Sequence, residues 1–301
     1  MTTFPLLRSA SRLVRAGALA ARPLFWLDLL AIGNLAFLGV DIVVAHAVNA
    51  FADPMEWAPV IFSAIGTLAM LAALRLGGLV PTIAGRGSRR RAMARLIGLA
   101  VGGGSIVVGV AGLVFHLRSA FFADQTLRNL VYTAPFSAPL AYSGVGLLLI
   151  LNRTVDDRTR EWAWWVVVLA LGGFLGNFSL SLADHAANGF FRPLEWAGVI
   201  AGAAGVGALA GVLAAPGNRP MAWLAAGVMA AEMVVGLLGF GLHVAANLAH
   251  PAAGVADRFL YGAPAFAPLL FDNIALIALI GLWGLTWPDA DTTTHGVGEA
   301  G

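Results

Sequence analysis

The chain has 301 residues, of which 59% are hydrophobic and only 11% are charged, and its mean hydropathy is +0.83. These values predict an all-α polytopic membrane protein and exclude an ordinary soluble domain. Cysteine is absent, which excludes disulfides and thiolate ligands, and the 18 basic residues are all arginine, which excludes a lysine Schiff base. The net charge of only +2, with arginines gathered in loops, also argues against nucleic-acid binding.

Eight apolar stretches are long enough to cross a hydrocarbon core of about 30 Å, which takes roughly 20 helical residues each. The chain is expected to divide into an interfacial segment (1–23), a first four-helix repeat (24–151), a short linker (152–161), a second repeat (162–287) and a disordered tail (288–301). In chain order the stretches lie at about 26–50, 57–83, 96–121, 130–151, 162–188, 196–215, 221–248 and 262–287.

Arginine placement predicts the orientation of these spans. Arginines crowd the N-terminal segment and the connections after the second and fourth stretches, and the positive-inside rule puts such loops in the cytoplasm. We therefore expect a bacterial inner-membrane protein with both termini cytoplasmic. Four spans per repeat is an even number, so the two repeats insert in the same direction and are related by a pseudo-twofold axis along the membrane normal. The arginines are Arg8, Arg12, Arg15, Arg22, Arg86, Arg89, Arg90, Arg91, Arg95, Arg153, Arg158 and Arg160.

An internal duplication supports two repeats. One block, from a histidine to a Pro-x-Glu-Trp sequence, recurs 139 positions later. A glycine-histidine block recurs 127 positions later, and a Tyr-x-Ala-Pro block recurs 129 positions later. We call residues related by these displacements matched positions. The matched pairs are His46 and His185, Asn49 and Asn188, Glu56 and Glu195, Gly109 and Gly236, Gly112 and Gly239, His116 and His243, and Tyr132 and Tyr261.

The four matched histidines are the candidate ligands. His46, His116, His185 and His243 each fall near the outer end of a span that leaves the cytoplasm, which predicts one layer of imidazoles. Neutral imidazole suits iron and copper. The cofactor is then haem b, in two bis-histidine sites, or a transition metal ion on which all four histidines converge. The alternative for any single one is an imidazole that bonds a neighbouring helix carbonyl.

Each set of residues around the histidines has a functional and a structural explanation. Gly112 and Gly239, one turn before a histidine, either leave room for a macrocycle or allow close helix packing. Arg128 and Arg258 either pair with haem propionates or extend to the interface. Glu56 and Glu195, with Asn49 and Asn188, either orient the histidine rings or belong to ordinary helix ends. Tyr132 and Tyr261 precede two prolines, which predicts bent helices with freed carbonyls.

Three acids at unmatched positions, Asp41, Glu232 and Asp272, are candidates for a proton or ion path, because an intramembrane acid is costly unless it is used. No phosphate-binding loop, zinc-protease motif or covalent haem motif occurs.

The general plan is similar to membrane b-type cytochromes and to bacterial polytopic copper- or haem-handling proteins. This resemblance implies electron transfer or metal handling, with a membrane redox partner or a larger complex as the partner. The alternatives are a secondary transporter that uses the three acids and an accessory subunit of a membrane complex.

Overall fold

The computed structural model describes residues 22–76 and 89–286, and this part of the chain contains helices and no strand. Six helices are long and apolar enough to cross a membrane, by length and composition, and they indicate a membrane-spanning protein. Large apolar side chains such as Leu68, Val107 and Ile200 are exposed on them, as lipid-facing residues would be. The six are α2 (Pro23–Ala47), α3 (Trp57–Arg75, after a 3-10 turn at Pro54–Glu56), α4 (Arg89–Arg118), α7 (Arg160–Ala187), α8 (Glu195–Ala214) and α9 (Arg219–Ala249).

The other two predicted spans are broken. In place of one helix at about 130–151, the chain forms α5 (Leu127–Tyr132) and the 15-residue α6 (Leu140–Thr154). In place of one helix at about 262–287, it forms α10 (Val255–Leu260) and the 18-residue α11 (Leu269–Thr286). The prediction of continuous helices was wrong there.

The breaks fall at the duplicated prolines. Pro135 and Pro139 lie between α5 and α6, and Pro264 and Pro268 lie between α10 and α11. Proline lacks a backbone N–H and disfavours helical geometry in the residue before it, so two prolines four apart stop the helix instead of bending it.

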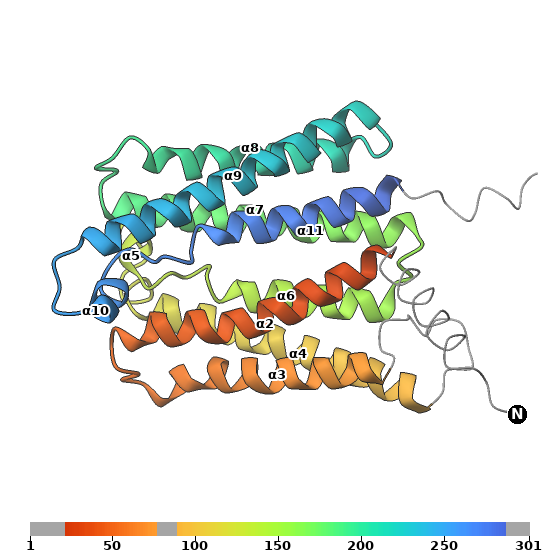
Figure 1. Ribbon diagram of the computed structural model, residues 1–301, viewed down its shortest axis with the longest axis horizontal. Helices are drawn as coiled ribbons and strands as arrows, with labels where there is room; N and C mark the ends of the chain where they lie inside the picture. The colour runs from red at the N-terminus through yellow and green to blue at the C-terminus, as the bar shows by residue number, and fades with distance from the viewer. Residues whose placement is uncertain (1–21, 77–88, 287–301) are drawn as a thin grey trace, which may run out of the picture.

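The long helices form two groups, whose arrangement can be followed in Figure 1. In the first group α2 packs on α3, α3 on α4, α4 on α6, and α6 packs back on α2. The second group repeats this order with α7, α8, α9 and α11. The groups meet where α6 contacts α7 and where α11 contacts α2, while α5 contacts α7 and α10 contacts α2. Each of these helix contacts therefore has a counterpart at the matched helices.

The four histidine-bearing helices α2, α4, α7 and α9 run in the same direction, toward the end of the molecule where α5 and α10 lie (Figure 1). We call this the histidine end. The opposite end, the arginine end, holds Arg22 and the connection between α6 and α7. Three predicted parts of the chain lie outside the described residues. They are the N-terminal segment 1–23 apart from residues 22 and 23, the stretch 77–88, and the tail from residue 288, which includes His295.

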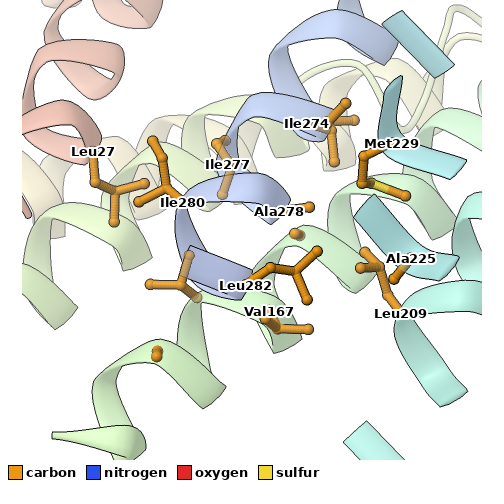
Figure 2. Close-up of a cluster of buried hydrophobic side chains, with 14 of the residues drawn as sticks. Leu27, Val167, Leu209, Ala225, Met229, Ile274, Ile277, Ala278, Ile280 and Leu282 are labelled. Carbon is orange, nitrogen blue, oxygen red and sulfur yellow. The ribbon is translucent and has the colours of Figure 1, made fainter. Parts of the chain in front are cut away.

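An apolar cluster fills the second group and the contact between the groups. Figure 2 shows α11 residues such as Ile274, Ile277 and Leu282 among side chains from α2, α7, α8 and α9. The labelled residues in it carry no oxygen or nitrogen in their side chains. The buried contact between the helices of the two groups is therefore nonpolar.

At the arginine end of the first group, the core contains a buried polar network. Arg153, predicted to be a loop residue, lies in the last turn of α6 and is only 3% exposed. Its guanidinium binds both carboxylate oxygens of Asp28 on α2, with Nη2 3.0 Å from Oδ2. Asn152 also donates to Asp28 at 2.9 Å and accepts from the indole N–H of Trp162 at 2.9 Å. This network joins α2, α6 and α7.

Candidate functional site

The last turns of α2 and α7 hold His46 and His185 in the same way. The N–H of Phe51 donates to the carbonyl of His46 at 3.2 Å, and the N–H of Phe190 donates to the carbonyl of His185 at 3.0 Å. The residue before each phenylalanine has a left-handed backbone, with φ of 56° in the first half and 72° in the second. These bonds and angles define a Schellman motif, in which the C-terminal carbonyls of a helix are satisfied.

The same motif brings an aromatic pair beside each histidine. Phe51 lies 6.0 Å from the His46 ring and stacks on Trp57 with centroids 4.1 Å apart. Phe190 lies 6.0 Å from the His185 ring and stacks on Trp196 at the same 4.1 Å. Both phenylalanines themselves have a positive φ, near 50°. Left-handed backbone is unfavourable for a residue with a side chain, so its presence at both matched positions marks a turn held by its surroundings.

A glutamate at the N-terminal end of the next helical segment faces each of these histidines. His46 Nδ1 lies 3.4 Å from Glu56 Oε2, and His185 Nδ1 lies 3.6 Å from Glu195 Oε2. These are ion-pair distances, longer than an ordinary hydrogen bond. The same Oε2 atom in both glutamates is buried without a hydrogen-bond partner.

The two asparagines behave differently from each other. Asn49 donates to Glu56 Oε1 at 2.7 Å, so it does reach the carboxylate beside His46. Asn188 donates to the backbone carbonyl of Asp184, on its own helix, at 3.2 Å. Asn49 therefore contacts the glutamate that faces His46, whereas Asn188 contacts only its own helix.

His116 and His243 are held by the carbonyls that the proline breaks release. The Nδ1 atom of His116 lies 2.8 Å from the carbonyl oxygen of Pro135, and that of His243 lies 2.8 Å from Pro264. A carbonyl oxygen only accepts hydrogen bonds, so Nδ1 carries the proton in both rings. The Nε2 atom of each neutral imidazole is then the one with a free lone pair. Tyr132 and Tyr261, each 61% exposed, mark these breaks but lie outside the site.

Different residues hold the broken segment against α4 and α9. In the first half, Ser119 and Thr133 both donate to the carbonyl of His116 at 2.7 Å, and Ser119 accepts from the N–H of Ala134. In the second half, Asn247 accepts from the N–H of Ala263 at 2.7 Å and donates to its carbonyl. Sequence reasoning missed these residues because Ser119 and Asn247 are not at matched positions.

Each half brings two of the histidines near each other. The rings of His46 and His116 have centroids 6.2 Å apart, and His185 and His243 are close enough to interact electrostatically. Within the described residues, no group of three or more His, Asp or Glu side chains is arranged to hold a metal ion. The expectation that all four histidines converge on one ion is therefore corrected, because the pairs belong to different helix groups.

The helix faces that carry Gly112 and Gly239 are covered by neighbouring side chains. A Cβ atom on Gly112 would lie 2.7 Å from Pro139, and one on Gly239 would lie 2.8 Å from Pro268. The predicted room for a macrocycle is absent at these positions, because the helix that follows the break packs directly on them. The alternative explanation, close helix approach through small residues, accounts for Gly112 and Gly239.

The two arginines near the histidine end do not share a contact. Arg258 donates to the carbonyl of Leu248 at 2.7 Å, near the C-terminus of α9, where a cation is favourable. Arg128 is exposed on α5 and lines an open pocket with Asp124 and Tyr132. In neither case does the guanidinium lie at a histidine pair.

The three acids also separate. Asp41 on α2 is close enough to Tyr142 to interact electrostatically with its hydroxyl. Glu232 on α9 lies beside the backbone of Gly205 on α8, and Asp272 on α11 lies against Gly236 on α9. A fourth half-buried acid, Asp184, directly precedes His185 on α7. Like the other three acids, Asp184 lies inside an apolar stretch of the sequence, and this signal could have identified it.

The site thus consists of two similar halves. Each contains one histidine facing a glutamate and one histidine bound to a proline carbonyl, at the same end of the molecule. No protein-family model, no curated protein and no solved structure matches this chain.

Proposed function

We propose that the chain is an integral membrane protein that binds a transition metal at two histidine pairs, for electron transfer or for metal or haem handling. The pairs are His46 with His116 and His185 with His243. The observation that carries the proposal is the 2.8 Å contact from Nδ1 to a backbone carbonyl, present in both halves. Metal-ligating histidines typically donate their other ring N–H to a carbonyl or carboxylate, which fixes the tautomer that binds metal.

The geometry of the first pair supports one ion between two rings. Metal–nitrogen bonds of about 2.0–2.1 Å place two ligating Nε2 atoms roughly 4 Å apart across the metal. Ring centroids 6.2 Å apart are compatible with that separation. Two imidazoles leave coordination positions open for an exchangeable ligand. The filled faces of Gly112 and Gly239 favour a bare copper or iron ion over haem b, which needs a flat cavity.

The proposal is tested by metal content and absorption of the purified protein. We expect up to two copper or iron ions per chain after dialysis. His116→Ala and His243→Ala should each lose about half of the bound metal, because each variant removes one ligand from one pair. If haem b is the form bound, an absorption band of bis-histidine haem should fall in the same proportion.

His250→Ala is the matched control, since His250 is exposed just after α9 and belongs to neither pair. It should leave the bound metal unchanged. A protein that retains no copper, iron, zinc or haem would contradict the proposal. A single variant that removed all of the metal would contradict two independent pairs.

We further propose that eight segments cross a bacterial inner membrane, as two parallel four-helix repeats. The broken segments α5–α6 and α10–α11 then each complete a crossing. Two observations support this arrangement: the contacts of the first group recur at matched helices in the second, and the arginine end holds Arg22, Arg89 and Arg160. The arginine end faces the cytoplasm under the positive-inside rule.

Single cysteines test this topology cleanly because the chain has none of its own. Asp124→Cys and Phe191→Cys, in loops at the histidine end, should react with a membrane-impermeant thiol reagent in intact cells. Thr154→Cys and Pro216→Cys, at the arginine end, should react only after permeabilisation. If the α5–α6 segment does not cross, Thr154→Cys will be labelled in intact cells, and the eight-span proposal fails.

A secondary transporter is the second candidate. It is favoured by Glu232, which is 1% exposed near the middle of the 31-residue α9. An acid buried at that depth is the usual mark of a proton or ion path. If the purified protein is a transporter of this kind and binds no metal, the acids and not the histidines are its functional groups.

A further inference from the structure

Glu232 places a carboxyl group between α8 and α9, among residues of the apolar cluster. Its side chain is 1% exposed and belongs to the buried stripe of α9, one residue of which is Met229. It lies beside the backbone of Gly205 on α8, and a Cβ atom on that glycine would be 2.8 Å from the ring of Phe174 on α7. Met229 and Phe174 both belong to the apolar cluster. The acid therefore lies in a nonpolar part of the second group.

One oxygen of this carboxyl group has no partner. Oε2 of Glu232 is buried and takes part in no hydrogen bond. An ionised carboxylate is so unfavourable in such a place that the group normally takes up a proton and becomes neutral, unless a cation compensates it. The burial of Glu232 therefore requires either a cation or a bound proton.

No basic side chain supplies the cation. Among the described residues, the ion pairs do not include Glu232. Arg219 and His243, on the same helix, are about 20 and 17 Å away by helical rise. Asp272 lies against Gly236. The other ionisable groups on the helices packed against α9, and on α7, are Glu195 on α8, Asp257 and Arg258 on α10, and Arg160, Glu161, Asp184 and His185 on α7.

The two helices that enclose Glu232 also offer almost nothing to coordinate a metal ion. From Trp196 to Ala214, α8 has no side-chain oxygen, and from Pro220 to Leu242 the only one on α9 belongs to Glu232. Hard cations such as Ca²⁺ and Mg²⁺ take about six or more oxygen ligands. In the described part of the chain, no group of three ligating side chains occurs. A proton needs only one carboxylate oxygen, so it fits these surroundings.

The first group carries a neutral polar side chain at the matched position. Ser105, 127 residues before Glu232, is fully buried, and its hydroxyl oxygen also lacks a partner. The same place in the fold thus holds a hydroxyl group in one half and a titratable group in the other. A neutral carboxylic acid resembles the hydroxyl group, whereas a carboxylate does not.

We propose that Glu232 is a proton-binding site, at which a single carboxyl group holds one exchangeable proton in the resting protein. Release passes the proton to water and leaves a carboxylate, and uptake reverses this step. The inference names a proton as the ion of the candidate transporter, and it rests on that candidate only for the use of the proton. Proton binding is measured separately from metal content, so its failure leaves the histidine proposal standing.

Infrared spectroscopy of the full-length protein in phosphatidylcholine vesicles tests the site. In mildly acidic buffer, the wild type should show the carbonyl stretch of a protonated carboxylic acid, which moves to lower frequency in D₂O because the proton exchanges. Glu232→Gln, of similar size and always neutral, should lack about one carboxylic acid per chain in this band. Glu232→Ser, which carries the first-half residue, should lack the same intensity. The lost intensity should be the part that disappears from the wild-type band in alkaline buffer.

Two variants serve as controls. Glu161→Gln removes an exposed acid at the start of α7, and Ser105→Ala changes the matched position of the first half. Both should keep the full band, and circular dichroism verifies the helix content of every variant. Replacing choline chloride with sodium chloride should not change the wild-type band. The proposal is overturned if both Glu232 variants keep the full band, or if sodium removes the Glu232 intensity, because a metal cation would then occupy the site.

Discussion

Replacing Arg153 with leucine should lower the free energy of unfolding by about 3–5 kcal/mol, the usual cost of leaving a buried charge without its partner. Asp28 is fully buried, and both of its carboxylate oxygens are bound by the Arg153 guanidinium. In Arg153→Leu only Asn152 still donates to that carboxylate, at 2.9 Å. One neutral hydrogen bond does not compensate for the lost charge.

The second half of the chain supplies the rescue. The positions that match Asp28, Asn152 and Arg153 are Val167, Gly281 and Leu282. Figure 2 shows Val167 and Leu282 in the apolar cluster, and a Cβ atom on Gly281 would lie 2.9 Å from Val167. The same helix contact therefore exists in this molecule in a charged and an apolar form.

Transferring the apolar form into the first half should restore stability. We expect the triple variant Asp28→Val, Asn152→Gly, Arg153→Leu to recover part of the loss of Arg153→Leu, because a well-packed apolar contact is often as stable as a buried ion pair. Recovery is incomplete because the buried indole N–H of Trp162 loses its acceptor, Asn152. Unfolding in mixed detergent micelles, followed by circular dichroism, measures both changes.

Arg158→Leu is the control, since Arg158 is exposed in the neighbouring connection. It should change the unfolding free energy by no more than about 0.5 kcal/mol. If Arg153→Leu unfolds like the wild-type protein, the ion pair is not formed. If the triple variant is as unstable as the single one, the matched positions are not structurally equivalent.

The second large effect is expected where α4 and α6 approach through glycines. A Cβ atom on Gly102 would lie 2.9 Å from the carbonyl oxygen of Gly146, and a Cβ atom on Gly146 would be closer still to the carbonyl oxygen of Gly102. These neighbours are backbone atoms, which cannot rotate away. Gly146→Ala should therefore destabilise the protein by about 1–3 kcal/mol through overpacking.

Gly144→Ala is the matched control on the same helix. Nothing lies within 4 Å of a Cβ atom built at Gly144, so the substitution adds a methyl group without a clash. Alanine is a better helix former than glycine by about 0.8–1.0 kcal/mol, so this variant should be as stable as the wild type or more stable. The same unfolding assay compares the two. Equal stability of Gly146→Ala and Gly144→Ala would show that α4 and α6 are further apart than described.

The class of the protein and the framework of its site could be predicted from the sequence. Long apolar stretches have only one stable backbone arrangement in lipid other than a closed barrel, so composition alone indicates helices that span a membrane. The matched histidines, glutamates and prolines followed from the duplication, and the freed carbonyl at Pro135 followed from the chemistry of proline. Each of these features is a residue type, a spacing or a recurrence along the chain, so none of them requires knowledge of which helices touch.

The contacts between helices were decided by the tertiary structure. The glycines before His116 and His243 were open to two readings, and only the position of the following helix showed that their faces are filled. Asp28 and Arg153 are 125 residues apart, and nothing in either segment identifies the other as its partner. Which faces of two helices touch depends on their rotation and separation, which follow from packing over the whole bundle and not from the periodicity of one segment.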